Sequence, residues 1–275
     1  MLLRKLFPRG FVGDLAEWII NFIEVNLSGF FTMLTNLLEF FLGNLLWAFS
    51  ALPIWGVIVI TAGLIYLKTR RFITTLLVIF GLYLIYTMYL WEEFLETVSL
   101  MVVAIFMALL IGIPLGILMG KIKLIDVIFT PVLDFMQTMH PFVYLIPVVF
   151  IFGLGMVPGV IVTTIFAIPP PARLVSLGIK QVDRRYIEAG EAFGATPLQL
   201  LFRVEIPLAM PSIITGINQC IMLSLSMVII AAMIASGGLG EEITRAISRL
   251  AVGPGIEAGL AVVILGMILD RLTTS

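Results

Sequence analysis

Charged residues are scarce in this chain. Lys, Arg, Asp and Glu make up 12% of the 275 residues, hydrophobic residues make up 61%, and the mean hydropathy is +1.16. A soluble domain carries about 25% charged residues. So low a charge content, interrupted by long apolar runs, excludes a soluble globular protein and predicts a multi-pass protein of the cell membrane. The net charge of −1 leaves no basic face for nucleic acid.

Cysteine and histidine are nearly absent as well. The single cysteine, Cys220, lies in an apolar run, so the chain can form no internal disulfide framework. His140 is the one histidine and precedes Pro141. Because a metal site needs several ligands, we expect His140 to be structural rather than a ligand or proton relay. We expect Cys220 to be a small core residue, and the chain to hold no cofactor.

Catalytic motifs are missing too. The sequence contains no Gly-x-x-x-x-Gly-Lys-[Ser/Thr] phosphate loop, no His-Glu-x-x-His and no Gly-x-Ser-x-Gly. The first of these motifs binds nucleotide phosphates, and the other two are typical of metalloproteases and hydrolases. Their absence argues against an enzyme and against ATP binding in a phosphate loop.

What the chain does contain is a series of apolar runs. Seven of them are near the ~20 residues that a helix needs to cross a bilayer. They cover residues 51–67, 72–91, 97–120, 126–152, 157–180, 212–235 and 256–272. The fourth is interrupted by Pro131, Pro141 and Pro147, which predicts a broken span. The pattern predicts an all-α polytopic membrane protein with about seven transmembrane helices.

A polar stripe marks the residues before the first run. Its members recur at steps of three and four residues: Asn21, Glu24, Ser28, Thr32, Thr35 and Glu39. Because the other sides of such a helix are Ile, Phe and Leu, the periodicity predicts an N-terminal amphipathic helix at the membrane interface. A tilted extra span with its polar stripe facing protein is the alternative.

Basic residues indicate the orientation of the spans. Most fall in alternate loops or at the end of the last run: Lys68, Arg70, Arg71, Lys121, Lys123, Lys180, Arg184, Arg185, Arg203 and Arg271. The positive-inside rule places these segments in the cytoplasm and the acidic residues 92–96 outside. Seven spans then place the N-terminus outside, although Arg4, Lys5 and Arg9 conflict with that placement.

One loop, residues 183–211, is far more polar than the rest of the chain. Asp183 is a predicted N-cap, and Gly194 is a predicted C′ residue that ends the first helix. The following Thr-Pro-Leu-Gln predicts a capping box, and Pro207 and Pro211 are expected to end a second short helix. We therefore expect two ordered helices in water, which together form a docking surface for a soluble partner.

This loop resembles the EAA loop of ABC importer permeases, which runs Glu-Ala-Ala, three residues, Gly, nine residues, then Ile-x-Leu-Pro. The matching residues are Glu188-Ala189-Gly190, Gly194 and Val204-Glu205-Ile206-Pro207. Gly190, Val204 and Ile206 replace the second Ala, the Ile and the Leu. The resemblance implies a coupling helix that sits in a groove of a separate ATPase subunit. The implied coupling residues are Glu188, Ala189, Gly190, Glu191, Ala192, Phe193, Gly194 and Pro207.

The resemblance also implies a division of the chain and a set of partners. Residues 1–96 would be a scaffold of the amphipathic helix and two spans. Residues 97–275 would be the five-helix core of a type I ABC importer permease. The implied partners are a second permease chain in a homodimer, a dimer of ATPase subunits that hydrolyses ATP, and an extracellular or lipid-anchored substrate-binding protein.

Further stretches resemble permeases for glycine betaine and proline betaine: residues 133–139, 142–147, 177–182 and 216–219. In that family proline often follows the residue equivalent to Met139, and His140 departs from this pattern. The resemblance implies uptake of such osmoprotectants under osmotic stress by alternating access. Choline, carnitine or an amino acid are alternative substrates. A stand-alone channel or an intramembrane enzyme is a further alternative, which the ordered polar loop disfavours.

Polar residues inside the spans are candidates for the translocation pathway. Asp126, Thr130, Asp134 and Gln137 follow one another at steps of four, four and three, so they share a helix face. An intramembrane carboxylate is a functional candidate, although pairing with Lys121, Lys123 or backbone is favoured for Asp126. Our pathway candidates are Asp134, Gln137, Phe142, Tyr144 and Asn218. Hydrogen bonds between helices are the alternative role for each.

A charged segment in the last outer loop is a candidate for docking the substrate-binding protein. Its predicted contacts are Gly238, Glu241, Arg245 and Arg249. The last three share a helix face at steps of four, so a solvated and self-paired helix is the alternative. No compact aromatic cluster suited to a quaternary ammonium is evident, so we place selectivity mainly in the binding protein.

Overall fold

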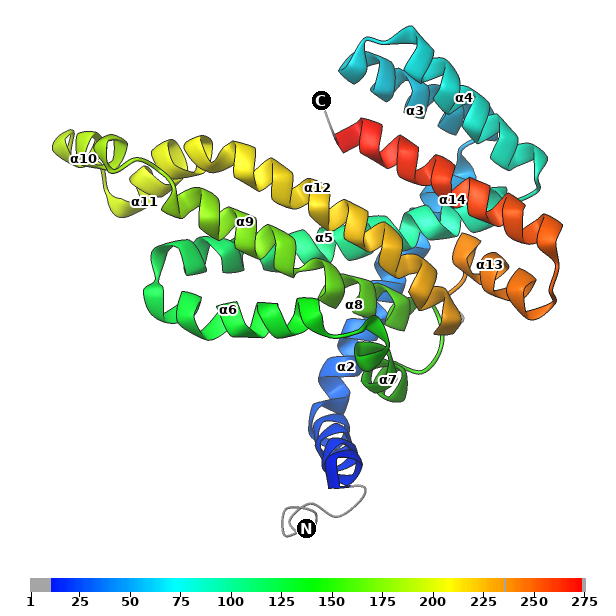
Figure 1. The fold of residues 1–275 in the computed structure, drawn as a ribbon, viewed down its shortest axis with the longest axis horizontal. Helices are drawn as coiled ribbons and strands as arrows, with labels where there is room; N and C mark the ends of the chain where they lie inside the picture. Colours follow the sequence, from blue (N-terminus) through cyan, green and yellow to red (C-terminus); the bar gives the residue numbers. More distant parts are fainter. Residues whose placement is uncertain (1–10, 235, 274–275) are drawn as a thin grey trace, which may run out of the picture.

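Every regular element in the part of the chain that the computed structural model describes, residues 11–234 and 236–273, is a helix. In chain order the elements are α2 (Phe11–Ala51), α3 (Ile54–Thr69), α4 (Phe72–Thr87), α5 (Trp91–Lys121), α6 (Lys123–Thr138), α7 (Pro141–Phe152), α8 (Met156–Ala167), α9 (Pro169–Lys180), α10 (Arg184–Ala192), α11 (Pro197–Leu200), the π-helix η1 (Leu201–Glu205), α12 (Ile206–Ala231), the 3-10 helix η2 (Ala232–Ile234), α13 (Gly238–Ser248) and α14 (Val252–Thr273) (Figure 1). The all-α prediction is confirmed.

The helices account for all seven expected runs. Five segments are long and apolar enough to cross a membrane: Ile20–Ala51, Trp91–Lys121, Met156–Lys180, Pro197–Ala231 and Val252–Leu272. The pair α6 and α7, bent by 97°, is a sixth if it is counted as one span. α3 and α4 are shorter apolar helices of 16 residues each. The bend lies at Met139 and His140, where the sequence predicts a break.

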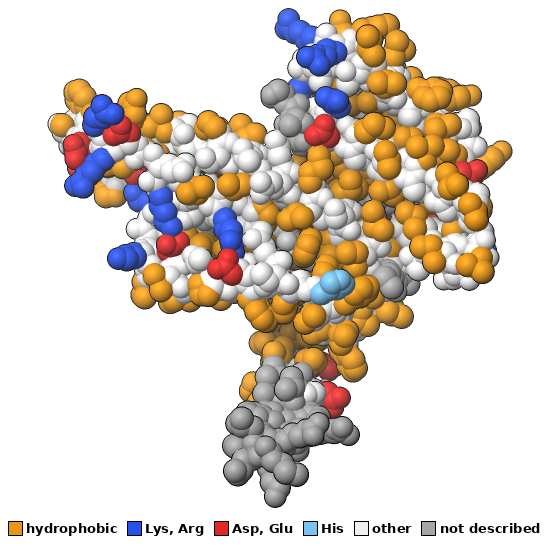
Figure 2. All heavy atoms as spheres, in the orientation of Figure 1, with side chains coloured by type: hydrophobic (Ala, Val, Ile, Leu, Met, Phe, Trp, Pro, Cys, Tyr) orange, Lys and Arg blue, Asp and Glu red, His pale blue; other side chains and the backbone are white. Residues whose placement is uncertain are grey.

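The predicted orientation is consistent with the arrangement of the helices. The α3–α4 turn, the α5–α6 turn, the α10–α11 segment and the end of α14 all point toward the same side of the molecule (Figure 1). The Lys and Arg side chains visible in Figure 2 gather on that side. The positive-inside rule makes it the cytoplasmic side. Arg4, Lys5 and Arg9, which conflict with the rule, lie outside the described residues.

The N-terminal helix α2 crosses the bundle. In Figure 1 it runs at a steep angle to α5, α9 and α12 rather than alongside them. It is anchored near the outer end of the bundle, where Leu38 and Leu42 are buried in one cluster with Phe94 and Val157. α2 is long and apolar enough to span a membrane, but its direction across the spans favours an amphipathic helix at the interface.

Two local expectations are wrong. The third run does not begin at residue 97, because α5 begins at Trp91 and carries Glu92 and Glu93 in its first turn. Carboxylates are stabilising at a helix N-terminus, which explains the longer helix. Pro207 and Pro211 do not end a helix either. The chain continues helically from Pro197 to Ala231, with η1 before Pro207, and both prolines lie within α12.

α9 packs between α5 and α12, so closely that backbone atoms of neighbouring helices are in contact. Three glycines four residues apart turn one face of α5 toward α9: Gly112, Gly116 and Gly120. A Cβ atom on Gly116 would lie 2.5 Å from the carbonyl oxygen of Ala172. On the other side of α9, a Cβ atom on Gly178 would lie 2.8 Å from the Cβ of Ser212. Small residues that let helices touch are the common solution in membranes, where apolar side chains gain nothing by leaving lipid.

Gly116→Ala is therefore expected to destabilise the protein by about 1–3 kcal/mol, because the added methyl group meets backbone rather than a movable side chain. Thermal unfolding of the purified protein in detergent would measure the loss as a lower midpoint. Gly259→Ala in α14 is the matched control, since nothing lies within 4 Å of its added Cβ atom. Equal midpoints for Gly116→Ala and the unchanged protein would contradict this account of the packing.

Candidate coupling surface and translocation pathway

The cytoplasmic loop has both of its predicted caps. A carboxylate oxygen of Asp183 accepts a hydrogen bond from the backbone N–H of Arg185 at 3.0 Å and starts α10. Hydrogen bonds from the Arg185 guanidinium and N–H lower the pKa of the Asp183 carboxyl, so the cap is ionised at neutral pH. Gly194 follows the helix at φ +76°. Thr196 and Gln199 form the capping box that starts α11.

α10 is a largely exposed helix. It forms a tip of the molecule beyond the ends of α9 and α12 (Figure 1), and none of its residues is buried. The predicted coupling residues are exposed except for Gly190, which is partly buried. The side chain of Phe193 stands 93% exposed. A large apolar side chain held out in water beside charged residues is typical of a surface that binds another protein.

Gly190 lies at the close contact between α10 and α11. A Cβ atom at this position would lie 2.4 Å from the Cδ2 atom of Leu200, which is buried. The two short helices therefore meet at a distance that favours glycine. This contact gives a physical reason for the replacement of the second alanine in the Glu-Ala-Ala motif.

An ion pair joins the polar loop to the first core helix. Lys121 Nζ, at the end of α5, lies 2.7 and 2.9 Å from the two carboxylate oxygens of Glu205. Glu205 is 1% exposed, whereas the Lys121 side chain is 40% exposed. A buried carboxylate is strongly destabilising unless it is paired, so Lys121 holds η1 against α5. The motif contains Glu205, but nothing in the local sequence pattern indicates its partner.

Lys121→Met is expected to lower the stability by about 1–3 kcal/mol, because it leaves the buried Glu205 carboxylate unpaired. The double variant Lys121→Met, Glu205→Gln should recover most of the loss, and Lys121→Arg should keep the pair. Thermal midpoints of the four proteins would test this. A double variant less stable than Lys121→Met alone would mean that the pair does not control the stability of this region.

Two predicted pathway residues line one hollow. Gln137 of α6 and Asn218 of α12 face a hollow of about 390 Å³. Its other lining residues are Pro170, Thr215, Gln219, Met222, Leu223 and Asp270. Amide, hydroxyl and carboxylate groups thus converge from α6, α12 and α14 at a level where the surrounding chain is apolar. Such convergence is expected along a solute path.

Asp134 pairs with a residue that the sequence analysis missed. Its carboxylate forms an ion pair with Arg173 of α9. Arg173 is a cation in the interior of the apolar run 157–180, and such a residue is a signal of the same kind as Asp134, since intramembrane charges are costly and usually functional. Arg173 could have been identified on that ground.

Asp126 is paired, as favoured from the sequence, but with a different partner. Its Oδ1 atom lies 2.6 Å from Lys180 Nζ on α9. Lys121, one of the expected partners, is engaged with Glu205 instead. The two carboxylates of α6 therefore both pair with cations of α9.

The other two pathway candidates belong to the helix break. Tyr144 is 7% exposed, and its hydroxyl donates to the carbonyl oxygen of Met136 across the bend. Phe142 is exposed and stacks on His140, with the ring centroids 5.1 Å apart. His140 caps α7, since its Nδ1 accepts from the Phe142 N–H at 3.5 Å. The structure thus gives Tyr144 and His140 packing roles, in line with the structural role predicted for His140.

Gly238, a predicted docking residue, is buried in the structure. Its N–H donates to Glu96 Oε2 at 2.7 Å, and the N–H of Leu239 donates to Thr97 Oγ1 at 2.8 Å. Both acceptors lie near the start of α5. Gly238 therefore attaches α13 to α5 through its backbone N–H.

The charged residues of α13 pair with one another. Arg245 lies 3.0 Å from Glu241 and also pairs with Glu242, while Arg249 is exposed at the end of the helix. A hollow of about 290 Å³ beside them is lined mainly by carboxylates: Glu92, Glu93, Glu96, Gly237, Gly238, Glu241, Glu242 and Arg245. This outer surface is acidic and would suit a basic face on a partner.

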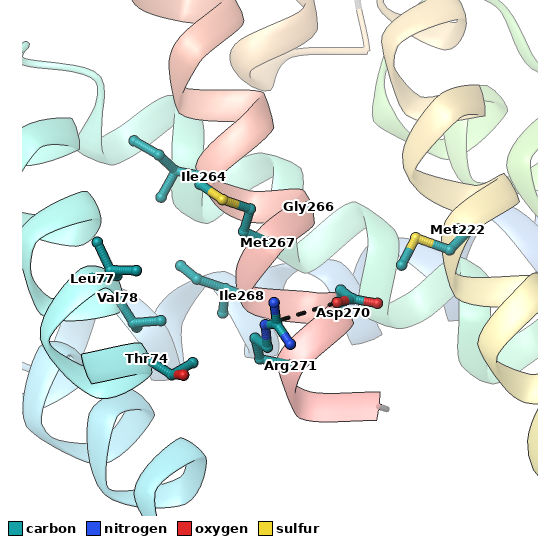
Figure 3. Close-up of a pocket in the computed structure, with 10 residues that line it drawn as sticks. All are labelled: Thr74, Leu77, Val78, Met222, Ile264, Gly266, Met267, Ile268, Asp270 and Arg271. Atoms are coloured by element: carbon teal, nitrogen blue, oxygen red, sulfur yellow. Dashed lines mark ion pairs between the residues drawn. The ribbon is translucent and has the colours of Figure 1, made fainter. Parts of the chain in front are cut away.

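A second hollow of about 390 Å³ lies between α4 and α14, with Met222 of α12 at its edge (Figure 3). Apolar side chains such as Leu77, Val78 and Ile264 form most of its wall. Arg271 and Asp270 lie at one end, with Nε and Oδ2 3.9 Å apart. Because its charged groups lie together at one end and the rest is apolar, this hollow is less suited to a polar solute than the one at Asn218.

The described residues thus form a multi-helix membrane bundle with an exposed two-helix loop at one end and ion pairs among its helices. The chain belongs to the family described as binding-protein-dependent transport system inner membrane component, whose family model matches residues 112–275. It is a multi-pass component of the cell membrane, and its role is transport.

Curated relatives match most of the chain. It is 43% identical over 264 residues to the glycine betaine/carnitine transport permease protein GbuB of Listeria monocytogenes, covering 94% of each chain. It is 41% identical over 266 residues to the glycine betaine transport system permease protein OpuAB of Bacillus subtilis, covering 97% of this chain and 94% of OpuAB. Identity to the glycine betaine/proline betaine permease ProW of Escherichia coli is 51% over 183 residues, 66% of this chain and 52% of ProW.

The fold is also that of a chain in a solved ABC transporter. A chain of the MetNI methionine ABC transporter in an inward-facing conformation superposes with a TM-score of 0.57 at 22% identity. The match covers 64% of this chain and 88% of that one. This likeness establishes the type I ABC permease fold of the core.

Proposed function

We propose that this permease imports glycine betaine, proline betaine or closely related osmoprotectants with energy from ATP. It acts as a homodimer with two ATPase subunits and receives its solute from an extracellular or lipid-anchored binding protein. The observation that carries the proposal is the similarity along nearly the whole chain to permeases named for glycine betaine. The exposed α10, with its coupling motif and the protruding Phe193, supports an ATPase partner.

Carnitine is a second candidate substrate, because GbuB is named for glycine betaine and carnitine. More distant relatives are named for trimethylamine N-oxide and choline. The named solutes share a fully substituted nitrogen, and most of them also carry an anionic oxygen. This common chemistry supports a small zwitterion as the preferred cargo.

The geometry suggests how ATPase movement would reach the pathway. α11, η1 and α12 form one continuous helical segment from the cytoplasmic loop to the hollow at Asn218. The pair of Lys121 with Glu205 joins the base of this segment to α5. When α10 follows its groove in the ATPase, α12 and α5 would move together, and the hollow would open alternately to each side.

The test is transport by the assembled importer. The chain would be co-expressed with a candidate ATPase and a candidate binding protein from the same genome and reconstituted into proteoliposomes with ATP. Uptake of labelled glycine betaine should require both ATP and the binding protein, should rise with salt and should be reduced by unlabelled carnitine. ATP hydrolysis without uptake of either solute would refute the substrate class. Failure to associate with any ATPase would refute the importer itself.

Gly190→Leu is expected to lower uptake per ATP hydrolysed about tenfold or more, because it pushes α10 away from α11 and out of its groove. The protein should still fold, since the nearest atom is a movable methyl group of Leu200. Gly43→Leu in α2, where an added Cβ atom has nothing within 4 Å, is the control and should retain coupling. Unchanged coupling in Gly190→Leu would count against α10 as the coupling helix.

A further inference from the structure

The charged residues of α6 and α9 form one continuous seam. On α6 its members are Asp126, Thr130, Asp134 and Gln137, and on α9 they are Pro170, Arg173, Leu177 and Lys180. Both sets step by three and four residues, so each occupies a single helix face. The hollow at Gln137 and Pro170 meets one end of the seam, and a hollow of about 270 Å³ beside Arg173 and Lys180 follows toward the cytoplasm.

The seam lies at membrane depth, and yet its charged side chains are partly exposed on the surface of the single chain. Asp134 lies about 16 Å along α6 from its cytoplasmic end, near the middle of a ~30 Å hydrocarbon core. Its carboxylate is 55% exposed in the single chain and the Arg173 side chain is 34% exposed. Charges at this depth face protein or water rather than lipid. The seam must therefore face the partner chain or an aqueous path.

Unused hydrogen-bonding capacity favours the aqueous path. Among the residues that the structure describes, buried Arg173 Nε has no hydrogen-bond partner, although another nitrogen of the same guanidinium pairs with Asp134. The hydroxyl of Ser176, a residue only 3% exposed, lines the hollow and has no partner either. Hydrogen-bond donors that lack an acceptor in a polar hollow indicate a site where a ligand or water accepts those hydrogen bonds.

We propose that this seam, defined by the Asp134–Arg173 and Asp126–Lys180 pairs, is the binding path for a zwitterionic solute in the inner half of the permease. The proposal rests on the function proposed above and adds the residues that recognise the cargo. A carboxylate of the solute would accept hydrogen bonds from Arg173, and its cationic nitrogen would lie beside Asp134. The second pair, about 12 Å further along α6, would offer the same two charges again.

Paired charges suit transport better than isolated ones. A zwitterion can replace each half of an ion pair without leaving a charge uncompensated, so the exchange is nearly balanced. A quaternary nitrogen donates no hydrogen bond, so the carboxylates hold it by Coulomb attraction alone. Binding of this kind is strong enough for entry and weak enough for release, as successive sites along a path require.

The first test neutralises one pair in the complete reconstituted importer. Asp134→Asn with Arg173→Gln removes both charges, keeps polar groups of similar shape and leaves no unpaired charge. Glycine betaine uptake per ATP hydrolysed should fall about tenfold, the effect of losing a charge-assisted hydrogen bond. The unfolding midpoint should stay unchanged. Arg71→Gln, an exposed cation just before α4 and away from α6 and α9, is the control and should transport normally.

The double variant separates this proposal from a structural ion pair. A pair that only holds α6 to α9 predicts that single variants lose stability and that the double variant regains wild-type transport. That result would overturn the proposal and leave the proposed function intact. If the unchanged importer takes up no glycine betaine, the proposed function fails, and the second test decides the fate of the seam.

The second test asks whether water reaches the seam from the cytoplasmic side. Thr130→Cys, in a Cys220→Ala background, should react with a membrane-impermeant maleimide added from the cytoplasmic side, and glycine betaine should slow the reaction. Ile128→Cys, an exposed position about 160° around the same helix from Thr130, is the control and should not react because it lies on the face turned away from the seam. An unreactive Thr130→Cys in the assembled importer would overturn the proposal, even if every variant of the ion pair failed to fold.

Discussion

Backbone contact among α5, α9 and α12 is the constraint on which the rest of the structure depends. Gly116 and Gly178 leave no space for a side chain on either side of α9. A membrane gives no hydrophobic gain for burying apolar side chains, so this close fit supplies the cohesion that a soluble core would obtain from water. The three helices consequently behave as one rigid body, and any change of conformation must occur at its margins.

α6 is such a margin. Among its residues only Leu133 is buried, and its remaining contacts with α9 include the two ion pairs. Helices with few buried contacts open at the lowest cost. One wall of the polar seam is therefore fixed, because α9 is held from both sides. The opposite wall is attached by interactions that water or a charged solute can replace.

Much of this arrangement could be predicted because its signals are local. Apolar run lengths located the spans, and the Asp183 and Thr196 caps located the cytoplasmic helices within a residue or two. What escaped prediction is non-local: Lys121 and Glu205 are 84 residues apart in sequence, and Arg173 meets Asp134 across 39. Pattern analysis also misjudged Pro207, because η1 joins α11 to α12 and Pro207 lies in the first turn of α12. It misjudged Gly238 because the burial of that residue depends on contacts made by α5.

The π-helical turn at Leu201–Glu205 has a consequence for everything that follows it in α12. A π-turn holds one residue more than an α-turn, and each residue rotates a helix by about 100°. The extra residue therefore sets the azimuth of α12, and with it the direction in which Asn218 and Thr215 point. The π-turn that contains Glu205 thus also determines which face of α12 turns its polar residues toward the hollow. The rotation of this one helix therefore links the position of the cytoplasmic loop to the residues that line the hollow.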